Sequence, residues 1–354
     1  ELETNEPIQK WSIRLKSQGD VYDEKSPHFY EFLDTVRVNN KVDLADYFQL
    51  NDGSMYIFEM IGVDLAGNIS DAVFLDSVHY DITPPVITMI YPFNNEAINN
   101  PTISYAISEK LAFGEILWTQ VDGAEDSLSP HIVSMVGEEL SPEEKIRINM
   151  INEPILMDGS IYSVTLNGRD LASNDSDPVT VSNILYDTTP PSFSSVKPDS
   201  GSALNHQRIS YSISEDLFKG EVIWIRTGGE NDPDAPHKVP LSDAERKYGD
   251  HNELTLINMP QLTDGGIYTI LFTGADRAGN VADTIAIKDI LYDFTKPEIL
   301  VNYPSQNLIT NSTDVSYTLS ENIYKGEFKW DRVGGVEDTL APYVAILEAD
   351  EMKK

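Results

Sequence analysis

The 354-residue chain contains no cysteine, which excludes a disulfide framework and thiolate metal sites. It has no apolar run of the roughly 20 residues that a membrane-spanning helix needs, so we expect no membrane insertion in this segment. Basic residues are scarce: 25 lysines and arginines stand against 58 aspartates and glutamates, a formal net charge of −33. Such a charge repels nucleic acid phosphates and attracts cations, so we expect no nucleic acid partner.

Catalytic signatures are also missing. The sequence shows no nucleophile–base pair, phosphate-binding loop or HExxH zinc motif. The histidines are few, and His28, His131 and His237 recur after Ser-Pro or Ala-Pro. We interpret them as structural loop residues, with a weak metal ligand as the alternative. The sequence therefore predicts a protein that is not an enzyme.

What the sequence does contain is an internal repeat. Its four tryptophans, Trp11, Trp118, Trp224 and Trp330, lie 107, 106 and 106 residues apart. Three motifs recur in step: Asp-Gly-x-x-Tyr at 52–56, 158–162 and 264–268, Asp-x-Ala-(Gly/Ser)-Asn at 64–68, 170–174 and 276–280, and Tyr-Asp-x-Thr-(Pro/Lys)-Pro at 80–85, 186–191 and 292–297. A period of 106 residues is that of a whole small domain.

The proline-containing motif marks the predicted domain boundaries, because two prolines stiffen the chain and end strand pairing. We predict complete modules at 82–187 and 188–293. Residues 1–81 form a partial module that lacks its first strands, and residues 294–354 form a module that is incomplete at its C-terminal end. We expect the partial modules to reflect a shortened chain or to complete each other between chains.

Within a module, short segments with period-2 patterning predict strands. Ile209–Ile213 and Val222–Ile225 are predicted to pair around the turn between them, and Ile267–Gly274 is predicted as a later strand. One tryptophan per module falls on what would be strand C of an immunoglobulin domain. The tyrosine of Asp-Gly-x-x-Tyr falls where that fold has a tyrosine corner, whose hydroxyl bonds the backbone. The predicted fold class is all-β, with tandem immunoglobulin-like β-sandwich repeats; another β-sandwich is the alternative.

The series Asp-x-Ala-Gly-Asn, a strand, then Tyr-Asp-x-Thr-Pro-Pro resembles the bacterial Ig-like repeats of large surface adhesins and biofilm-associated proteins. The resemblance implies rods of modules at the cell surface, and some family members bind calcium at their junctions. This chain departs from the pattern at Ser173, where the family has the turn glycine, and at Lys296, where it has the first proline.

Acidic side chains gather at the predicted junctions. In an immunoglobulin topology, the linker, the B–C turn and the F–G hairpin meet at one end of the domain, and calcium prefers such oxygen ligands. The candidate ligands are Asp81, Asp187 and Asp293 from the linkers, Glu109, Glu215 and Glu321 from the B–C turns, and Asp170, Asn174, Asp276 and Asn280 from the hairpins. The alternative is that these aspartates cap tight turns and the glutamates face solvent.

The functional hypothesis is a non-catalytic extracellular protein of the cell surface: a stalk, fibre or adhesin rod, stiffened by calcium and able to form filaments. Its expected partners are neighbouring modules, copies of the same protein, and surface glycans or proteins. The alternatives are a glycan- or protein-binding module and an accessory repeat region of a secreted hydrolase.

Overall fold

The computed structural model describes residues 8–33 and 47–354; residues 1–7 and 34–46 of the predicted 1–81 module lie outside the described residues. Two compact units are formed, one by residues up to Thr189 together with Arg277–Asn280, and one by Pro190–Asp276 together with Val281–Lys354. The described residues contain strands and a single 3-10 helix, η1 (Gly137–Leu140), but no α-helix. None of their helices is long and apolar enough to cross a membrane. The four-module division itself stays a prediction.

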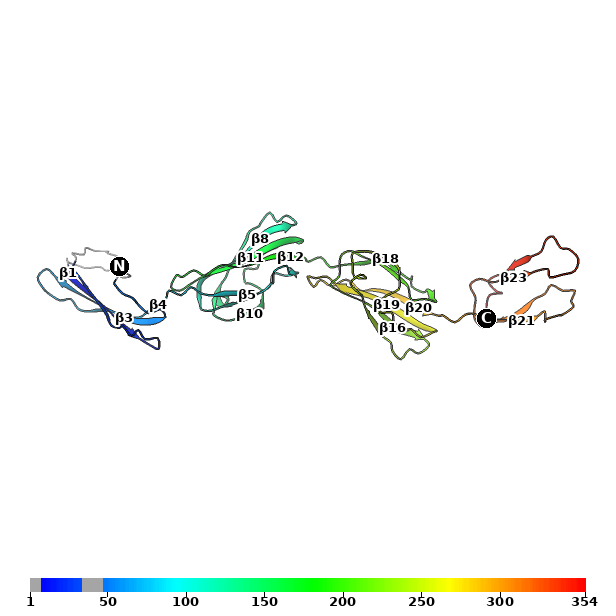
Figure 1. The fold of residues 1–354 in the computed structure, drawn as a ribbon, viewed down its shortest axis with the longest axis horizontal. Coiled ribbons are helices and arrows are strands. Elements are labelled where there is room, and N and C mark those ends of the chain that lie inside the picture. Colours follow the sequence, from blue (N-terminus) through cyan, green and yellow to red (C-terminus); the bar gives the residue numbers. More distant parts are fainter. Residues whose placement is uncertain (1–7, 34–46) are drawn as a thin grey trace. The chain divides into compact units, whose positions relative to one another are not determined.

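The second repeat is a sandwich of two sheets. One sheet has the order β10-β7-β5, made of Lys145–Ile148, Ile103–Ile107 and Ile87–Tyr91. The other has the order β6-β12-β11-β8-β9, made of Ala97–Ile98, Val179–Tyr186, Ser160–Asp170, Leu111–Gly123 and His131–Ser134. The two layers are visible in Figure 1, with β8, β11 and β12 in one and β5 and β10 in the other.

The third repeat has the same topology. Its first sheet is β13-β15-β18, made of Phe193–Lys197, Ile209–Ile213 and Gly249–Leu254. Its second is β14-β20-β19-β16-β17, made of Ala203–Leu204, Ile285–Tyr292, Gly266–Ala275, Lys219–Gly229 and His237–Pro240. The chain is thus an all-β array of tandem immunoglobulin-like β-sandwich repeats.

One strand pairing predicted from the sequence is wrong. Ile209–Ile213 is a strand, β15, but it pairs with β13 and β18, whereas β16, which contains Val222–Ile225, pairs with β17 and β19. The segment between β15 and β16 crosses from one sheet to the other. A period-2 pattern shows that a strand has one buried face, but two strands that face each other across a core carry the same pattern as two neighbours in one sheet.

The aromatic residues of the repeat lie at the centre of each sandwich. Trp118 and Trp224 are each 1% exposed, and their rings meet the edges of Tyr162 and Tyr268 at centroid distances of 6.1 and 6.2 Å. This edge-to-face geometry is favourable for aromatic pairs. On β19 the predicted alternation is confirmed, since Tyr268, Ile270 and Phe272 are fully buried.

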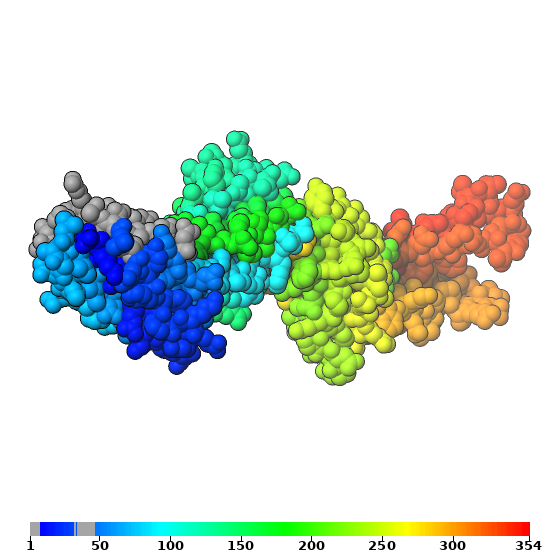
Figure 2. Space-filling view, turned by 60° about the vertical axis from the view of Figure 1, so that its left-hand side comes forward, coloured from blue at the N-terminus to red at the C-terminus, as the bar shows by residue number. Residues whose placement is uncertain are grey.

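The first and fourth repeats contain fewer described strands. The first has one sheet, β2-β1-β3-β4, made of His28–Phe32, Ile8–Gln18, Ser54–Asp64 and Val73–Tyr80. The fourth has two strand pairs, β21 (Ile299–Tyr303) with β22 (Ser316–Leu319) and β23 (Glu327–Trp330) with β24 (Tyr343–Ile346). Figure 2 shows these pairs as the orange and red lobes.

Exposure of the repeated tryptophan follows from these pairings. Trp118 lies on β8 and pairs across to Val164 of β11, and Trp224 lies on β16 and pairs across to Ile270 of β19. In the described part of the fourth repeat, β23 pairs only with β24, and Trp330 is 41% exposed. The indole is therefore buried in the repeats where the strand of the corner tyrosine lies beside it.

Candidate metal centre and buried carboxylate networks

Each proline-containing linker is held by the aspartate of the Asp-Gly-x-x-Tyr motif. Asp158 Oδ1 accepts hydrogen bonds from the Thr188 backbone N–H at 2.6 Å and the Thr188 hydroxyl at 2.9 Å, and its Oδ2 accepts one from the Thr189 hydroxyl at 2.8 Å. Asp52 and Asp264 hold their linkers in the same way. The Thr188 amide, together with these hydroxyls, keeps the pKa of Asp158 below its ordinary value. The two motifs thus act together to fix the direction in which the chain leaves the domain.

Three of the predicted ligands converge in the first unit. Asp81 follows β4, Glu109 lies in the turn between β7 and β8, and Asp170 ends β11. One carboxylate oxygen from each lies within 4.8 Å of the other two. Asp170 is 1% exposed, whereas Asp81 and Glu109 are half-buried. None of these three carboxylates takes part in a salt bridge with a described residue.

Asn174 holds Asp170 in place. Its backbone N–H donates to Asp170 Oδ1 at 2.9 Å, and its side-chain Nδ2 donates to Asp170 Oδ2 at 2.9 Å and to the Asp81 carbonyl at 3.1 Å. Burial raises the pKa of Asp170, but the hydrogen bonds from Asn174 outweigh burial and bring the pKa below its ordinary value. Asp170 is therefore ionised, as a cation ligand must be. The amide nitrogen of Asn174 is the group turned toward the carboxylates, so Asn174 orients the cluster.

The crowding of these carboxylates disfavours the ionised form of Glu109. Burial raises the pKa of Glu109, and the negative charges of Asp81, Asp170 and Asp52 raise it further. A carboxylate beside three others, with no cation paired to it, is electrostatically strained. The donor set, made of carboxylate oxygens from three different segments, fits a hard divalent cation such as calcium.

The other predicted ligands occupy equivalent places in their own repeats. Asp187 follows β12 in the first unit, and Asn280, which is counted with that unit, donates from Nδ2 to the Asp187 carbonyl at 2.7 Å. Glu215 follows β15, and Asp276, 3% exposed, follows β19 in the second unit. Asp293 and Glu321 follow β20 and β22, and among the described residues they belong to no group of three carboxylates.

A second carboxylate network was not foreseen from the sequence. Asp126 is 7% exposed, and its Oδ2 accepts hydrogen bonds from the Tyr162 hydroxyl at 2.6 Å and from His131 Nε2 at 2.5 Å. The Tyr162 hydroxyl in turn accepts the Met157 N–H at 2.9 Å, which confirms the predicted tyrosine corner. Burial raises the pKa of Tyr162, and the hydrogen bond to Asp126 helps to bring it to about 12, so the hydroxyl remains a donor.

The same network recurs in the neighbouring repeats as Asp23–His28–Tyr56 and Asp232–His237–Tyr268. Both the histidine and the tyrosine bond to one carboxylate, so the imidazole does not lie between the carboxylate and a nucleophile. This arrangement differs from a catalytic relay, in which the histidine bridges the two. It agrees with the structural role expected for the three histidines.

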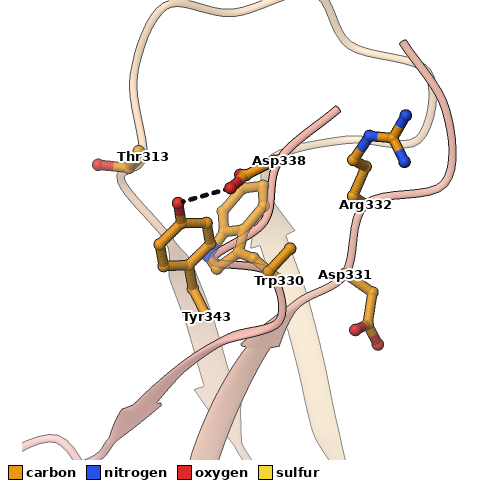
Figure 3. A pocket seen from close by; sticks show the side chains of 7 residues that line it. Thr313, Trp330, Asp331, Arg332, Asp338 and Tyr343 are labelled. Carbon is orange, nitrogen blue, oxygen red and sulfur yellow. Dashed lines mark hydrogen bonds between the residues drawn. The ribbon is translucent and has the colours of Figure 1, made fainter. Parts of the chain in front are cut away.

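In the fourth repeat a tyrosine stands at the histidine position. The Tyr343 hydroxyl donates a hydrogen bond to Asp338 Oδ1 at 3.2 Å. Figure 3 shows this pair beside Trp330. These side chains line a cavity of about 520 Å³ together with Thr313, Asp331 and Arg332. In the second and third repeats the corner tyrosine bonds to the aspartate that corresponds to Asp338. The cavity therefore marks a part of the sandwich core that the described strands do not cover.

A buried glutamate supplies a third repeated contact. Glu139, in η1, is 6% exposed, and its two carboxylate oxygens accept the backbone N–H groups of Val136 and Ile151, each at 2.7 Å. Its own carbonyl accepts the hydroxyl of the buried Tyr105 at 2.8 Å. Glu245 makes the equivalent contacts with Ser242, Ile257 and Tyr211. Glu139 thus joins the segment between β9 and β10 to the core of its module, and Glu245 does the same for the segment between β17 and β18.

Comparisons with known proteins give fold-level similarities only. No family model and no curated protein matches the sequence. Among solved structures, the chain is similar to the FN1–FN3 domains of chicken CNTN1, at 13% identity over 80% of this chain and 90% of that one, with a TM-score of 0.33. It is also similar to a tetra-tandem repeat in the extending region of a large adhesion protein, at 17% identity over 98% of this chain and 82% of that one, with a TM-score of 0.26. Neither similarity carries an argument about function.

Proposed function

We propose that the chain is a non-catalytic structural protein of the cell surface, in which tandem immunoglobulin-like modules form a stalk, fibre or adhesin rod and calcium stiffens the junctions. The observation that carries this proposal is the convergence of Asp81, Glu109 and Asp170, whose carboxylate oxygens lie within 4.8 Å of one another. Asp81 belongs to the linker, and the other two belong to the module that follows it. A cation held by all three would fix the linker to that module.

The electrostatics of the cluster favour this role. The pKa of Glu109 is raised by burial and by its acidic neighbours, so the cluster is strained without a counter-charge. Bound calcium would supply that counter-charge. The 106-residue repeat places Asp187, Glu215 and Asp276 at the corresponding sequence positions.

The linkers support a rod in a second way. Asp52, Asp158 and Asp264 each bond the x-Thr segment that precedes the linker prolines, so every junction begins with an anchored backbone. The repeated Asp–His–Tyr networks show that the buried polar groups serve each module's core. A protein that copies such groups once per module suits a spacer, in which every module does the same mechanical task.

Calorimetric titration of the whole chain with calcium tests the proposal. Glu109→Gln should weaken binding at the cluster of Asp81, Glu109 and Asp170, because it removes one ligand charge, whereas Glu144→Gln, an exposed change in the same repeat, should leave binding unaltered. At a calcium concentration of about 100 times Kd, binding should add about 2.7 kcal/mol to the stability of the folded state. Absence of calcium binding, together with melting that a chelator does not change, would refute the metal centre.

A further inference from the structure

A second cavity lies at one end of the third repeat, wholly within the second unit. It has a volume of about 770 Å³, and four connections line it: the turn before β15, the turn between β16 and β17, the segment between β18 and β19, and the start of the linker after β20. Its lining includes Gln207, Asp234, Met259, Leu262, Tyr292 and Phe294. Loops that converge at the end of a sandwich are the usual place for recognition in this fold.

Gln207 lines this cavity, and its side-chain oxygen is a buried acceptor without a donor. Gln207 is 8% exposed, and its side-chain Oε1 finds no hydrogen-bond partner among the residues that the structure describes. A buried oxygen without a donor is costly, because it has lost its water and gained nothing in return. The second repeat has Pro101 at this position, 106 residues earlier, so the fold itself does not require an acceptor here. A ligand in the cavity that donates a hydrogen bond would remove the cost once the Gln207 side chain turns its buried Oε1 toward it.

The charge of the lining indicates which donor fits. The lining contains Asp232, Asp234 and Asp264, and none of the described lining residues is basic. Asp232 already accepts hydrogen bonds from Tyr268 and His237. Asp264 already accepts them from Phe294 and Thr295. The carboxylate of Asp234 is exposed and forms no hydrogen bond or ion pair with the described residues. The second repeat has Leu128 there.

Apolar walls complete the cavity. Tyr292 and Phe294 have ring centroids 5.9 Å apart and are tilted at 56°, and Met259 and Pro260 line the cavity with them. The alkyl stem of a long cationic side chain packs on such surfaces, and its charged head interacts favourably with aromatic faces. We propose that this cavity binds a cationic side chain, an arginine or a lysine, of a partner protein. The acceptor of Gln207 and the charge of Asp234 receive its N–H donors, and Tyr292 and Phe294 contact its stem.

The test uses the whole chain and a minimal probe, N-acetyl-arginine amide, followed by amide chemical shifts in the TROSY spectrum. Shift changes should concentrate around Gln207, Asp234 and Phe294. The uncharged isostere N-acetyl-citrulline amide should bind at least about threefold more weakly, the effect of one exposed ion pair. Equal binding of the two probes would overturn the proposal.

Variants separate the cavity from the general acidity of the surface. Asp234→Asn should weaken the arginine probe about threefold, and Gln207→Met, which keeps the size but removes the acceptor, about fivefold. Asp283→Asn, an exposed aspartate outside the cavity, makes the same charge change and should have no effect. A loss as large in Asp283→Asn would mean diffuse electrostatic attraction. Larger shifts of the same signals with maltotriose would mean a sugar site, and either result would overturn the proposal.

Discussion

Removal of one hydroxyl from the Asp–His–Tyr network should destabilise a single repeat strongly. Tyr162 is fully buried, and its hydroxyl makes two hydrogen bonds, one from the Met157 N–H and one to the carboxylate of Asp126. Tyr162→Phe removes both without a change in the aromatic contact with Trp118. It leaves a backbone donor and one oxygen of the buried Asp126 carboxylate without this partner.

The size of the effect follows from the two bonds. A neutral hydrogen bond contributes about 1 kcal/mol and one to a charged group about 1.5–3 kcal/mol, so Tyr162→Phe should cost about 2–4 kcal/mol. For a cooperative unit of about 100 residues, this corresponds to a fall in Tm of about 10–20 °C. Tyr105 offers a matched control. It is equally buried, but its hydroxyl donates to a neutral backbone carbonyl, that of Glu139, so Tyr105→Phe should cost about 1 kcal/mol.

Differential scanning calorimetry of the whole chain measures both variants. The transition of the second repeat should move to lower temperature and separate from that of the third, whose own network around Tyr268 is intact. Tyr268→Phe should produce the mirror result. If Tyr162→Phe costs no more than Tyr105→Phe, the carboxylate does not depend on the phenol and the reasoning is refuted.

Three smaller effects are also expected. Burial raises the pKa of Asp23, but hydrogen bonds from His28 and Tyr56 lower it to about 2. Because this folded-state pKa lies below the unfolded value, the stabilisation that Asp23 contributes is fully present above about pH 4 and is lost as the pH drops toward 2. Urea unfolding at both pH values would show this loss. In chelator, Glu109→Gln should raise stability by about 0.5 kcal/mol, because it removes repulsion within the cluster; a loss would contradict the strain inferred from its raised pKa. Ser173→Gly should stabilise by up to about 1 kcal/mol, because Ser173 has φ +79°.

Each of these predictions has a control in the chain itself. Asp23→Asn should lose its effect as the pH falls through about 2, because the wild-type carboxylate is then protonated as well. Glu144→Gln should leave stability in chelator unchanged. The glycines that correspond to Ser173, Gly67 and Gly279, also have positive φ, so Gly279→Ser should destabilise by an amount similar to the gain from Ser173→Gly. Stability that is unchanged in both serine–glycine exchanges would show that this turn stores no strain.

The sequence by itself determined the repeat, the all-β class and the burial of one tryptophan and one tyrosine per sandwich. These properties are local or periodic: alternation marks a strand with one buried face, and Pro, Gly and Asn mark where strands end. Because the repeat has a period of 106 residues, each local conclusion about one module applies to the equivalent positions of the next. The convergence of Asp81, Glu109 and Asp170 could also be expected, because the topology brings their three segments to one end of the domain.

Only the tertiary structure decided which groups pair. No periodic signal in the sequence marks three of the observed features. They are the placement of β15 and β16 in different sheets, the hydrogen bond of Tyr162 to Asp126, which lies 36 residues earlier, and the acceptor of Gln207 that has no donor. Asn174 stays a predicted ligand, and the structure adds that its amide nitrogen donates to Asp170. Such contacts depend on how two sheets pack and on which polar atoms that packing removes from water. These contacts are set by long-range geometry, which residue type and spacing along the chain do not reveal.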